Sequence, residues 1–182
     1  MKNPQKKSQK KKNQNSSPQD YITDWMTSFV EKPHPLLGDL PPCPYARQAR
    51  LKGRIKMLWL SEAEPDSNCW THIENTDFDQ VEVLIIITDL ERWTWREAYE
   101  IRCELNRTFH DNDIVVLEDH PDYGEKIGNV DMSNGRYCLL FAQRRSKLNH
   151  FSDILRETTD YYKNWTQAEL DDIVTWRRQD PK

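Results

Sequence analysis

The first clear pattern along the chain is a helical repeat of apolar residues that begins after residue 16. In the segment PQDYITDWMTSFVEK, apolar side chains recur every three or four positions, which is typical of one buried helix face. Ser17 fits the N-cap, Pro18 fits the first helical position, and Asp20 places a negative charge at the positive end of the helix. Two prolines follow, so we expect this helix to end near Lys32.

Four later stretches have the composition of β-strands. They lie at residues 54–60, 81–88, 113–118 and 136–143, and the second (VEVLIIIT) has the apolar, branched character of a central strand. Between the second and third strands, WTWREAYEIRCELNRTF predicts a helix that begins with a capping box of Thr94 and Glu97. Further helices are predicted over residues 146–163 and after Thr166, where Glu169 repeats the capping signature.

The order of these elements predicts an α+β fold. Four strands, with enough helices to cover one face, favour a two-layer sandwich in which a four-stranded, mainly antiparallel sheet carries its helices on one face. A chain of 182 residues suits one domain. We therefore expect a single domain over residues 20–182, with residues 61–80 as a long acidic loop.

Charge divides the chain into two parts. Residues 1–19 carry six lysines, no acidic residue and almost nothing apolar, which predicts a disordered tail; 20 basic and 30 acidic side chains remain for the body. The tail suggests weak, salt-sensitive contact with nucleic acid or an acidic partner, and the alternative is a solubilising tail. An acidic body repels phosphate, which argues against nucleic-acid binding by the fold itself.

The composition also bears on the location of the protein. The longest apolar run is only a few residues, and no signal sequence follows the lysines, so we expect a cytoplasmic protein without membrane contact. The cytoplasm keeps thiols reduced. The four cysteines form no C-x-x-C pair, which argues against a disulfide framework and a structural zinc site. No motif identifies a cofactor or an oligomeric state.

The segment PPCPYAR, at residues 41–47, is the first candidate for chemistry. If Cys43 caps a short helix with Pro44 at its first position, the free N–H groups of the first turn lower the pKa of the thiol. Arg47, one turn later, adds positive charge. The segment thus predicts a nucleophilic or redox-active cysteine. The alternative is a structural corner in which a small residue is held between prolines.

The segment VVLEDHPDYGEKIGN contains the second candidate. His120 follows the third strand, where loops commonly carry function, and Glu118, Asp119 and Asp122 surround it. These carboxylates predict a raised pKa and an acid–base role for His120 together with Asp122. The same residues are a candidate site for a divalent metal, although their spacing fits no known ligand motif. The structural alternative is a turn marked by the flanking proline and glycine.

Together the two segments resemble an uncharacterised bacterial family of domains of unknown function. Residues 43–46 (CPYA) are similar to its early C-P-[FY]-A motif and residues 120–123 (HPDY) to its later H-P-D-Y motif, while Asn134 and Arg136 loosely match an Asn and an Arg that follow. The resemblance implies a soluble α+β domain but no known reaction. CPYA is also similar to the glutaredoxin motif C-P-Y-C, but a proline-rich connector replaces the strand that precedes the motif in thioredoxin-like folds.

Three hypotheses for function follow. The favoured one is a small cytoplasmic enzyme or redox protein that acts on an unknown small molecule, with a shared pocket formed by Cys43, Arg47, His120 and Asp122. The second is a non-enzymatic binding module whose lysine tail contacts nucleic acid or an acidic partner. The third is a metal-dependent hydrolase built on His120 and the acids beside it.

Overall fold

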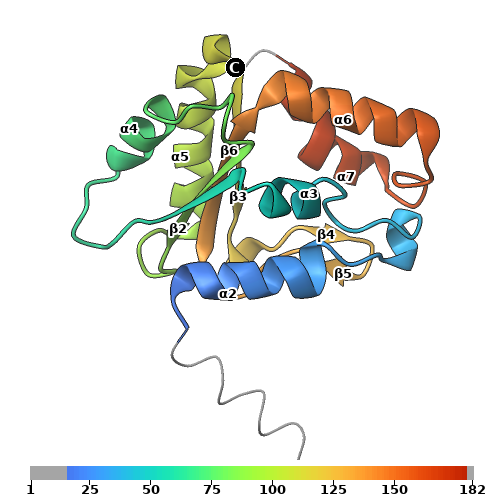
Figure 1. Ribbon diagram of the computed structural model, residues 1–182, viewed down its shortest axis with the longest axis horizontal. Coiled ribbons are helices and arrows are strands. Elements are labelled where there is room, and N and C mark those ends of the chain that lie inside the picture. Colours follow the sequence, from blue (N-terminus) through green and yellow to red (C-terminus); the bar gives the residue numbers. More distant parts are fainter. Residues whose placement is uncertain (1–15, 180–182) are drawn as a thin grey trace, which may run out of the picture.

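A four-stranded mixed sheet forms the centre of the molecule (Figure 1). The computed structural model describes residues 16–179, so most of the predicted tail lies outside the described residues. In their spatial order the strands of the sheet are β1 (Ile55–Trp59), β2 (Val83–Thr88), β6 (Cys138–Arg144) and β3 (Ile114–Asp119). β1 and β2 are parallel, whereas β6 is antiparallel to both of its neighbours. The α+β class and the four predicted strands are confirmed.

Helices and short turns connect the strands. The α-helices are α2 (Pro18–Trp25), α3 (Ala46–Leu51), α4 (Asn68–Glu74), α5 (Trp95–Thr108), α6 (Arg145–Thr158) and α7 (Gln167–Leu170). Shorter π- and 3-10 segments are η1 (Met26–Val30), η2 (Pro35–Leu37), η3 (His110–Asn112), η4 (Pro121–Tyr123), η5 (Asp171–Thr175) and η6 (Trp176–Arg178). A separate hairpin consists of β4 (Lys126–Ile127) and β5 (Val130–Asp131). Among residues 16–179, no helix is both long and apolar enough to cross a membrane.

Both faces of the sheet are covered by helices. On one face, Leu84 and Ile86 of β2 pack against α4 and α5. On the other, Ile85 and Ile87 pack beneath α2. Figure 1 shows α4 and α5 on one side of the strands and α3, α6 and α7 on the other. The prediction of helices on one face is therefore wrong in this respect: a continuous apolar run such as residues 83–87 is typical of a strand buried on both faces.

Three helices begin at capping boxes, and the sequence predicts two of these boxes and the N-cap of the third. In each, a hydroxyl accepts a hydrogen bond from the third helical N–H, and an acidic side chain at that position bonds back to the N-cap backbone. The pairs are Ser17 with Asp20, Thr94 with Glu97, and Thr166 with Glu169. Local chemistry within one turn thus determines where these helices begin.

The segment at residues 61–80 differs from the predicted loop because it contains α4. Cys69 and Ile73, four residues apart, are fully buried against the core on the α5 side of the sheet, and Trp70 packs beside them. The spacing of Cys69 and Ile73 was the helical signal, but one apolar pair is too short a pattern to distinguish a helix from a loop.

Candidate functional site

A cavity of about 300 Å³ lies on the α2 side of the sheet. Its volume is at the lower end of the range for small-molecule sites, roughly 300 to 1,000 Å³. Strand residues such as Ile85 and Phe141 form one wall, and η1, α3, α6 and the C-terminal segments form the others. Nine aromatic side chains line it: Trp25, Phe29, Tyr45, Phe141, Phe151, Tyr161, Tyr162, Trp165 and Trp176. The cavity therefore favours a molecule with a large apolar or aromatic surface.

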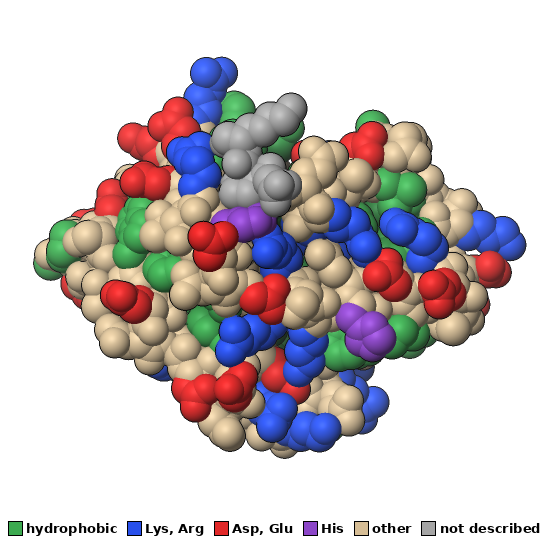
Figure 2. All heavy atoms as spheres, turned by 90° about the horizontal axis from the view of Figure 1, so that it is seen from above, with side chains coloured by type: hydrophobic (Ala, Val, Ile, Leu, Met, Phe, Trp, Pro, Cys, Tyr) green, Lys and Arg blue, Asp and Glu red, His purple; other side chains and the backbone are tan. Residues whose placement is uncertain are grey.

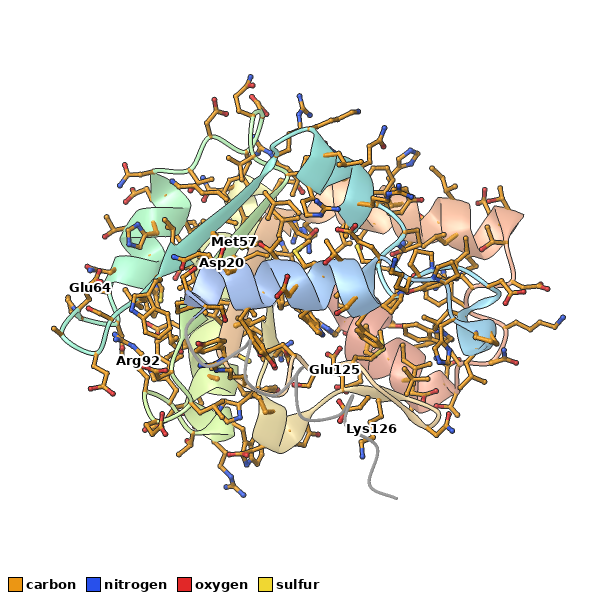
Figure 3. All side chains as sticks on the ribbon, turned by 60° about the horizontal axis from the view of Figure 1, so that its bottom comes forward. Asp20, Met57, Glu64, Arg92, Glu125 and Lys126 are labelled. Atoms are coloured by element: carbon orange, nitrogen blue, oxygen red, sulfur yellow. The ribbon has the colours of Figure 1, made fainter. Side chains whose placement is uncertain are left out.

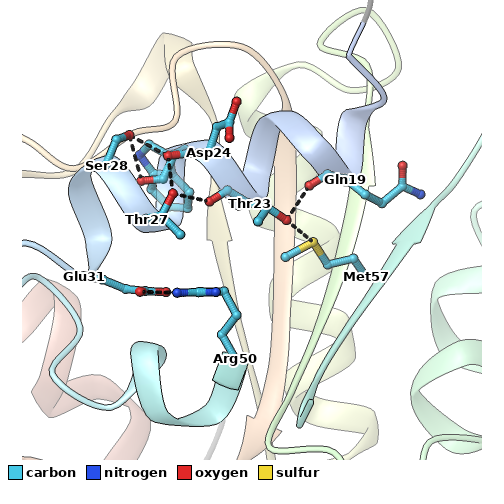
Figure 4. A network of polar contacts seen from close by, with 9 residues as sticks. Gln19, Thr23, Asp24, Thr27, Ser28, Glu31, Arg50 and Met57 are labelled. Atoms are coloured by element: carbon cyan, nitrogen blue, oxygen red, sulfur yellow. Dashed lines mark hydrogen bonds and ion pairs between the residues drawn. The ribbon is translucent and has the colours of Figure 1, made fainter. Parts of the chain in front are cut away.

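The wall that contains Cys43 is held in place by contacts between α3 and the end of η1. The Glu31 carboxylate accepts two hydrogen bonds from the Arg50 guanidinium, at 2.6 and 2.8 Å (Figure 4). Only 5 % of the Glu31 side chain is exposed, so this bidentate pair is more strongly held than a surface ion pair. The Cys43 N–H donates to the Val30 carbonyl at 3.1 Å. These contacts fix the connector before α3 against η1.

Cys43 does not cap α3, contrary to the sequence prediction. The N–H of Ala46 donates to the Cys43 carbonyl at 3.1 Å, so residues 43–46 form a turn of their own. The helix begins only after this turn, with Tyr45 at the N-cap position. The proline after Cys43 thus belongs to the turn and not to the first position of the helix.

The Cys43 thiol lines the cavity, which accounts for its exposure. Protein surrounds the cavity, and the resulting burial raises the pKa of the thiol above its ordinary value. Hydrogen bonds from the N–H groups of Tyr45 and Ala46 lower this pKa by less, and the Glu31 carboxylate raises it further. The predicted lowering of the pKa is therefore wrong, and the thiol is protonated at neutral pH.

The other three predicted site residues do not line the cavity. Arg47 is exposed on α3, and the Asp122 side chain is also exposed. His120 is only 3 % exposed: its Nδ1 accepts from the Asp122 N–H at 3.2 Å, and its Nε2 donates to the Trp93 carbonyl at 3.0 Å. With both ring nitrogens bonded to backbone, the imidazole caps η4. The structure supports the turn interpretation and does not unite the four residues in one pocket.

A second segment forms the same turn. His34 precedes η2 as His120 precedes η4, and its Nδ1 accepts from the Leu36 N–H at 3.2 Å. The two histidines have nearly the same φ angle, −132° and −129°. Residues 34–38 (HPLLG) and 120–124 (HPDYG) share the pattern H-P-x-x-G. This recurrence is the signal in the sequence that identifies both histidines as turn residues.

Carboxyl groups gather in another part of the cavity wall. Glu118 and Asp119 end β3, and Glu125 precedes β4. Arg102, from α5, pairs with Glu118 at 3.0 Å. Asp119 accepts two hydrogen bonds from Asn134, at 2.9 Å from the backbone and 2.7 Å from the side chain. Glu118 and Asp119 thus have fixed partners, although burial raises the pKa of both.

Glu125 differs from these two acids. Glu125 is exposed, as Cys43 is, and like Cys43 it lines the cavity. Within residues 16–179, no group donates a hydrogen bond to its carboxyl. Figure 3 shows Glu125 below the helical run formed by α2 and η1, whereas its neighbour Lys126 points outward. Because protein surrounds the cavity, the carboxyl is desolvated, and this effect, together with the charges of Glu118, Asp172 and Asp119, raises the pKa of Glu125 to about 8. Sequence reasoning missed this residue, because nothing in the local sequence EKIGN indicates that distant elements surround it.

Glu125→Gln is expected to remove a pH dependence of stability. The raised pKa means that the folded state holds this proton more tightly than the unfolded state does. The stabilising contribution is complete below the ordinary pKa of 4.5 and is lost as pH rises towards about 8. Urea unfolding at about pH 5 and about pH 9 should show a larger loss of stability in the wild type than in this variant.

The matched control is Glu100→Gln, the same chemical change at a position of α5 that does not line the cavity. It should follow the wild type at both pH values. If Glu125→Gln and the wild type lose stability in parallel as pH rises, the raised pKa of Glu125 is wrong.

The described residues also bear on metal binding. Within residues 16–179, no group of three or more His, Cys, Asp or Glu side chains is arranged to hold a metal ion. At His120, the histidine of the hydrolase hypothesis, both ring nitrogens already have backbone partners.

The surface charges do not form one patch on the face shown in Figure 2, where basic and acidic side chains are interspersed. All six lysines of the predicted tail lie within residues 1–15, outside the described residues. Contact of the tail with nucleic acid or an acidic partner therefore stays a prediction.

Comparisons with known proteins assign no family to the chain. No family model, no curated protein and no solved structure matches it. The resemblance of the CPYA and HPDY segments to a family of unknown function therefore also stays a prediction. The cavity and the residues that line it are therefore the features that bear on function.

Proposed function

We propose that the protein binds a small, largely apolar molecule in the cavity and acts on it through Cys43, as a small cytoplasmic enzyme or redox protein. The observation that carries this proposal is that the Cys43 thiol lines the aromatic cavity, where a bound molecule can reach it. Cys69 and Cys138 are instead fully buried between the sheet and its helices. A bound molecule cannot reach either of these two thiols, and burial also raises the pKa of each to about 12.

The surroundings of Cys43 determine how it would react. Because the raised pKa leaves the thiol protonated at neutral pH, reaction requires that its proton be removed, by higher pH or by a basic group of the bound molecule. The N–H groups of Tyr45 and Ala46 would then stabilise the thiolate. In a cytoplasmic setting the thiol stays reduced between reactions.

Cys43 is expected to react with iodoacetamide faster than Cys69 and Cys138 in the native protein, since it faces a cavity. Its rate should rise with pH, with a midpoint above that of a free thiol, because burial raises its pKa. Mass spectrometry of each cysteine peptide after timed labelling measures both quantities. Cys103 is partly exposed and does not line the cavity, so it serves as the internal reference.

Two further observations complete this test. Cys43→Ala should abolish the labelling assigned to Cys43. It should leave the unfolding curve nearly unchanged, because it removes only the sulfur atom of a side chain that lines the cavity. A small aromatic compound should slow the labelling of Cys43 but not of Cys103. If Cys43 reacts only after unfolding, or if no apolar compound protects it, the proposed function is wrong.

A further inference from the structure

We infer that the molecule bound in the cavity carries an organic ammonium group, which Glu125 binds while the aromatic walls enclose the apolar remainder. This inference rests on the proposed function and specifies its ligand class. Glu125 lines the same cavity as the nine aromatic side chains. Among the described residues, nothing donates a hydrogen bond to its carboxyl.

The charges around Glu125 leave it without a fixed counter-ion. Glu118, Asp119 and Asp172 all act on it with negative charge, and Arg102 is the positive charge that opposes them. Arg102 is already paired with Glu118 at 3.0 Å. Its guanidinium also lies over two rings, 4.6 Å from the centre of Tyr99 and 4.5 Å from that of Trp176. A cation that enters the cavity therefore meets an excess of carboxyl groups.

The other basic side chains of the cavity wall are bonded elsewhere. Arg177 donates to Asn149 at 3.0 Å, to the Ile173 carbonyl at 2.8 Å and to Ser152. The two remaining pairs are Arg144 with Asp79, at 3.0 Å, and Lys147 with Glu82, at 3.1 Å. Arg177 acts on the Glu125 carboxyl only as a charge, without a hydrogen bond. The position opposite Glu125 is thus open to a cation from a ligand.

The aromatic walls make an organic ammonium the best match. Aromatic faces attract cations, and a carboxylate combined with aromatic rings is the chemistry that recognises ammonium ligands. An inorganic divalent ion fits less well, because no group of three or more ligating side chains occurs within residues 16–179. The apolar surface of the cavity would remain uncovered by a bare ion but is covered by an aryl or alkyl group.

This arrangement makes binding depend on pH. The proton on Glu125 has to leave before the carboxylate can pair with a cation, so affinity for an ammonium should rise as pH increases through about 8. An aliphatic amine keeps its own charge until about pH 10, as a lysine side chain does. A neutral molecule of the same shape should show no such rise.

The test is calorimetric titration of the full-length protein with 2-phenylethylammonium chloride and with 2-phenylethanol, its neutral counterpart. At about pH 9 the ammonium should bind about tenfold or more tightly than the alcohol, and this preference should shrink at about pH 6. Glu125→Gln should abolish the preference. Glu100→Gln, at a site outside the cavity wall, should retain it. Protection of Cys43 from iodoacetamide shows that each probe occupies the cavity.

The outcomes separate this inference from the proposed function. If both probes protect Cys43 with equal affinity, and Glu125→Gln changes neither, the cavity binds apolar molecules but the ammonium inference is overturned. If potassium ions at the same concentration remove the preference, the site is one for inorganic cations, and the inference is again overturned. If neither probe binds or protects Cys43, both proposals fail.

Discussion

Asn134→Ala is expected to lower the free energy of unfolding by about 4 kcal/mol, because several buried polar groups would lose their partners together. Asn134 is only 5 % exposed. Its Nδ2 donates to the Asp119 carboxylate at 2.7 Å and to the Tyr137 carbonyl at 2.8 Å. Its Oδ1 accepts from the N–H groups of Arg136 and Tyr137, at 3.0 and 2.8 Å. Urea unfolding of the two proteins measures the difference.

The loss at Asn134 should also change the cavity wall. The Asn134 amide is one of the groups that lower the pKa of Asp119 against the opposing effect of burial. Without it, Asp119 should hold its proton to higher pH, which NMR titration of the carboxyl can follow. Asn75→Ala is the matched control, since that exposed amide bonds only to the Thr71 carbonyl at 2.9 Å. A destabilisation by Asn134→Ala no larger than that of the control would contradict the central role of this side chain.

Asn106→Leu is expected to lower the free energy of unfolding by about 3 kcal/mol, although leucine has nearly the same size. β3 is an edge strand, and within residues 16–179 no strand lies beside its outward N–H and carbonyl groups. Asn106, on the buried side of α5, accepts from the Val116 N–H at 2.9 Å and donates to the Val116 carbonyl at 2.8 Å. The amide thus replaces one residue of a missing strand, and leucine would leave both buried groups unpaired.

Hydrogen exchange provides the specific measurement for Asn106. The Val116 amide should exchange much faster in Asn106→Leu than in the wild type. The exchange rates of the amides in β2 should change only as far as the global stability of the protein changes. Arg107→Leu places the same side chain at an exposed position of the same helix, and should alter stability by no more than about 0.5 kcal/mol. Unchanged protection of Val116 would show that Asn106 does not stabilise the edge of β3. Since β3 ends in Glu118 and Asp119, loosening it should also disturb the acidic part of the cavity.

Local signals predicted most of the secondary structure. The N-cap at Ser17 and the two predicted capping boxes are confirmed because each depends on residues within one helical turn. The four strands are confirmed because their sequences are short and rich in branched or aromatic apolar residues, which favour strands over helices. The predicted helix is α5, and Ala98 and Leu105 on its buried face are both fully buried. Asn106 was not predicted on that face, since the polar edge of β3 that requires it comes from a later part of the chain.

The candidate site was only partly predictable. The local motif drew attention to Cys43, and the structure places that thiol in a cavity. A local motif also drew attention to His120. Both nitrogens of its ring, however, form hydrogen bonds with backbone groups, one of which is the Trp93 carbonyl. No motif in the local sequence indicated that Glu125 would be part of the site.

The sequence by itself determined where helices and strands begin, because capping and apolar periodicity act between residues a few positions apart. Only the tertiary structure decided which side chains share the cavity and which of them carry charge. The pKa of Cys43 is raised because η1, α3 and the C-terminal segments bury its thiol. The pKa of Glu125 is raised first by the protein that surrounds the cavity and desolvates the carboxyl, and then by the carboxylates that β3 and η5 bring close to it. Desolvation and Coulomb interactions depend on distance in space, and only the folded chain fixes those distances.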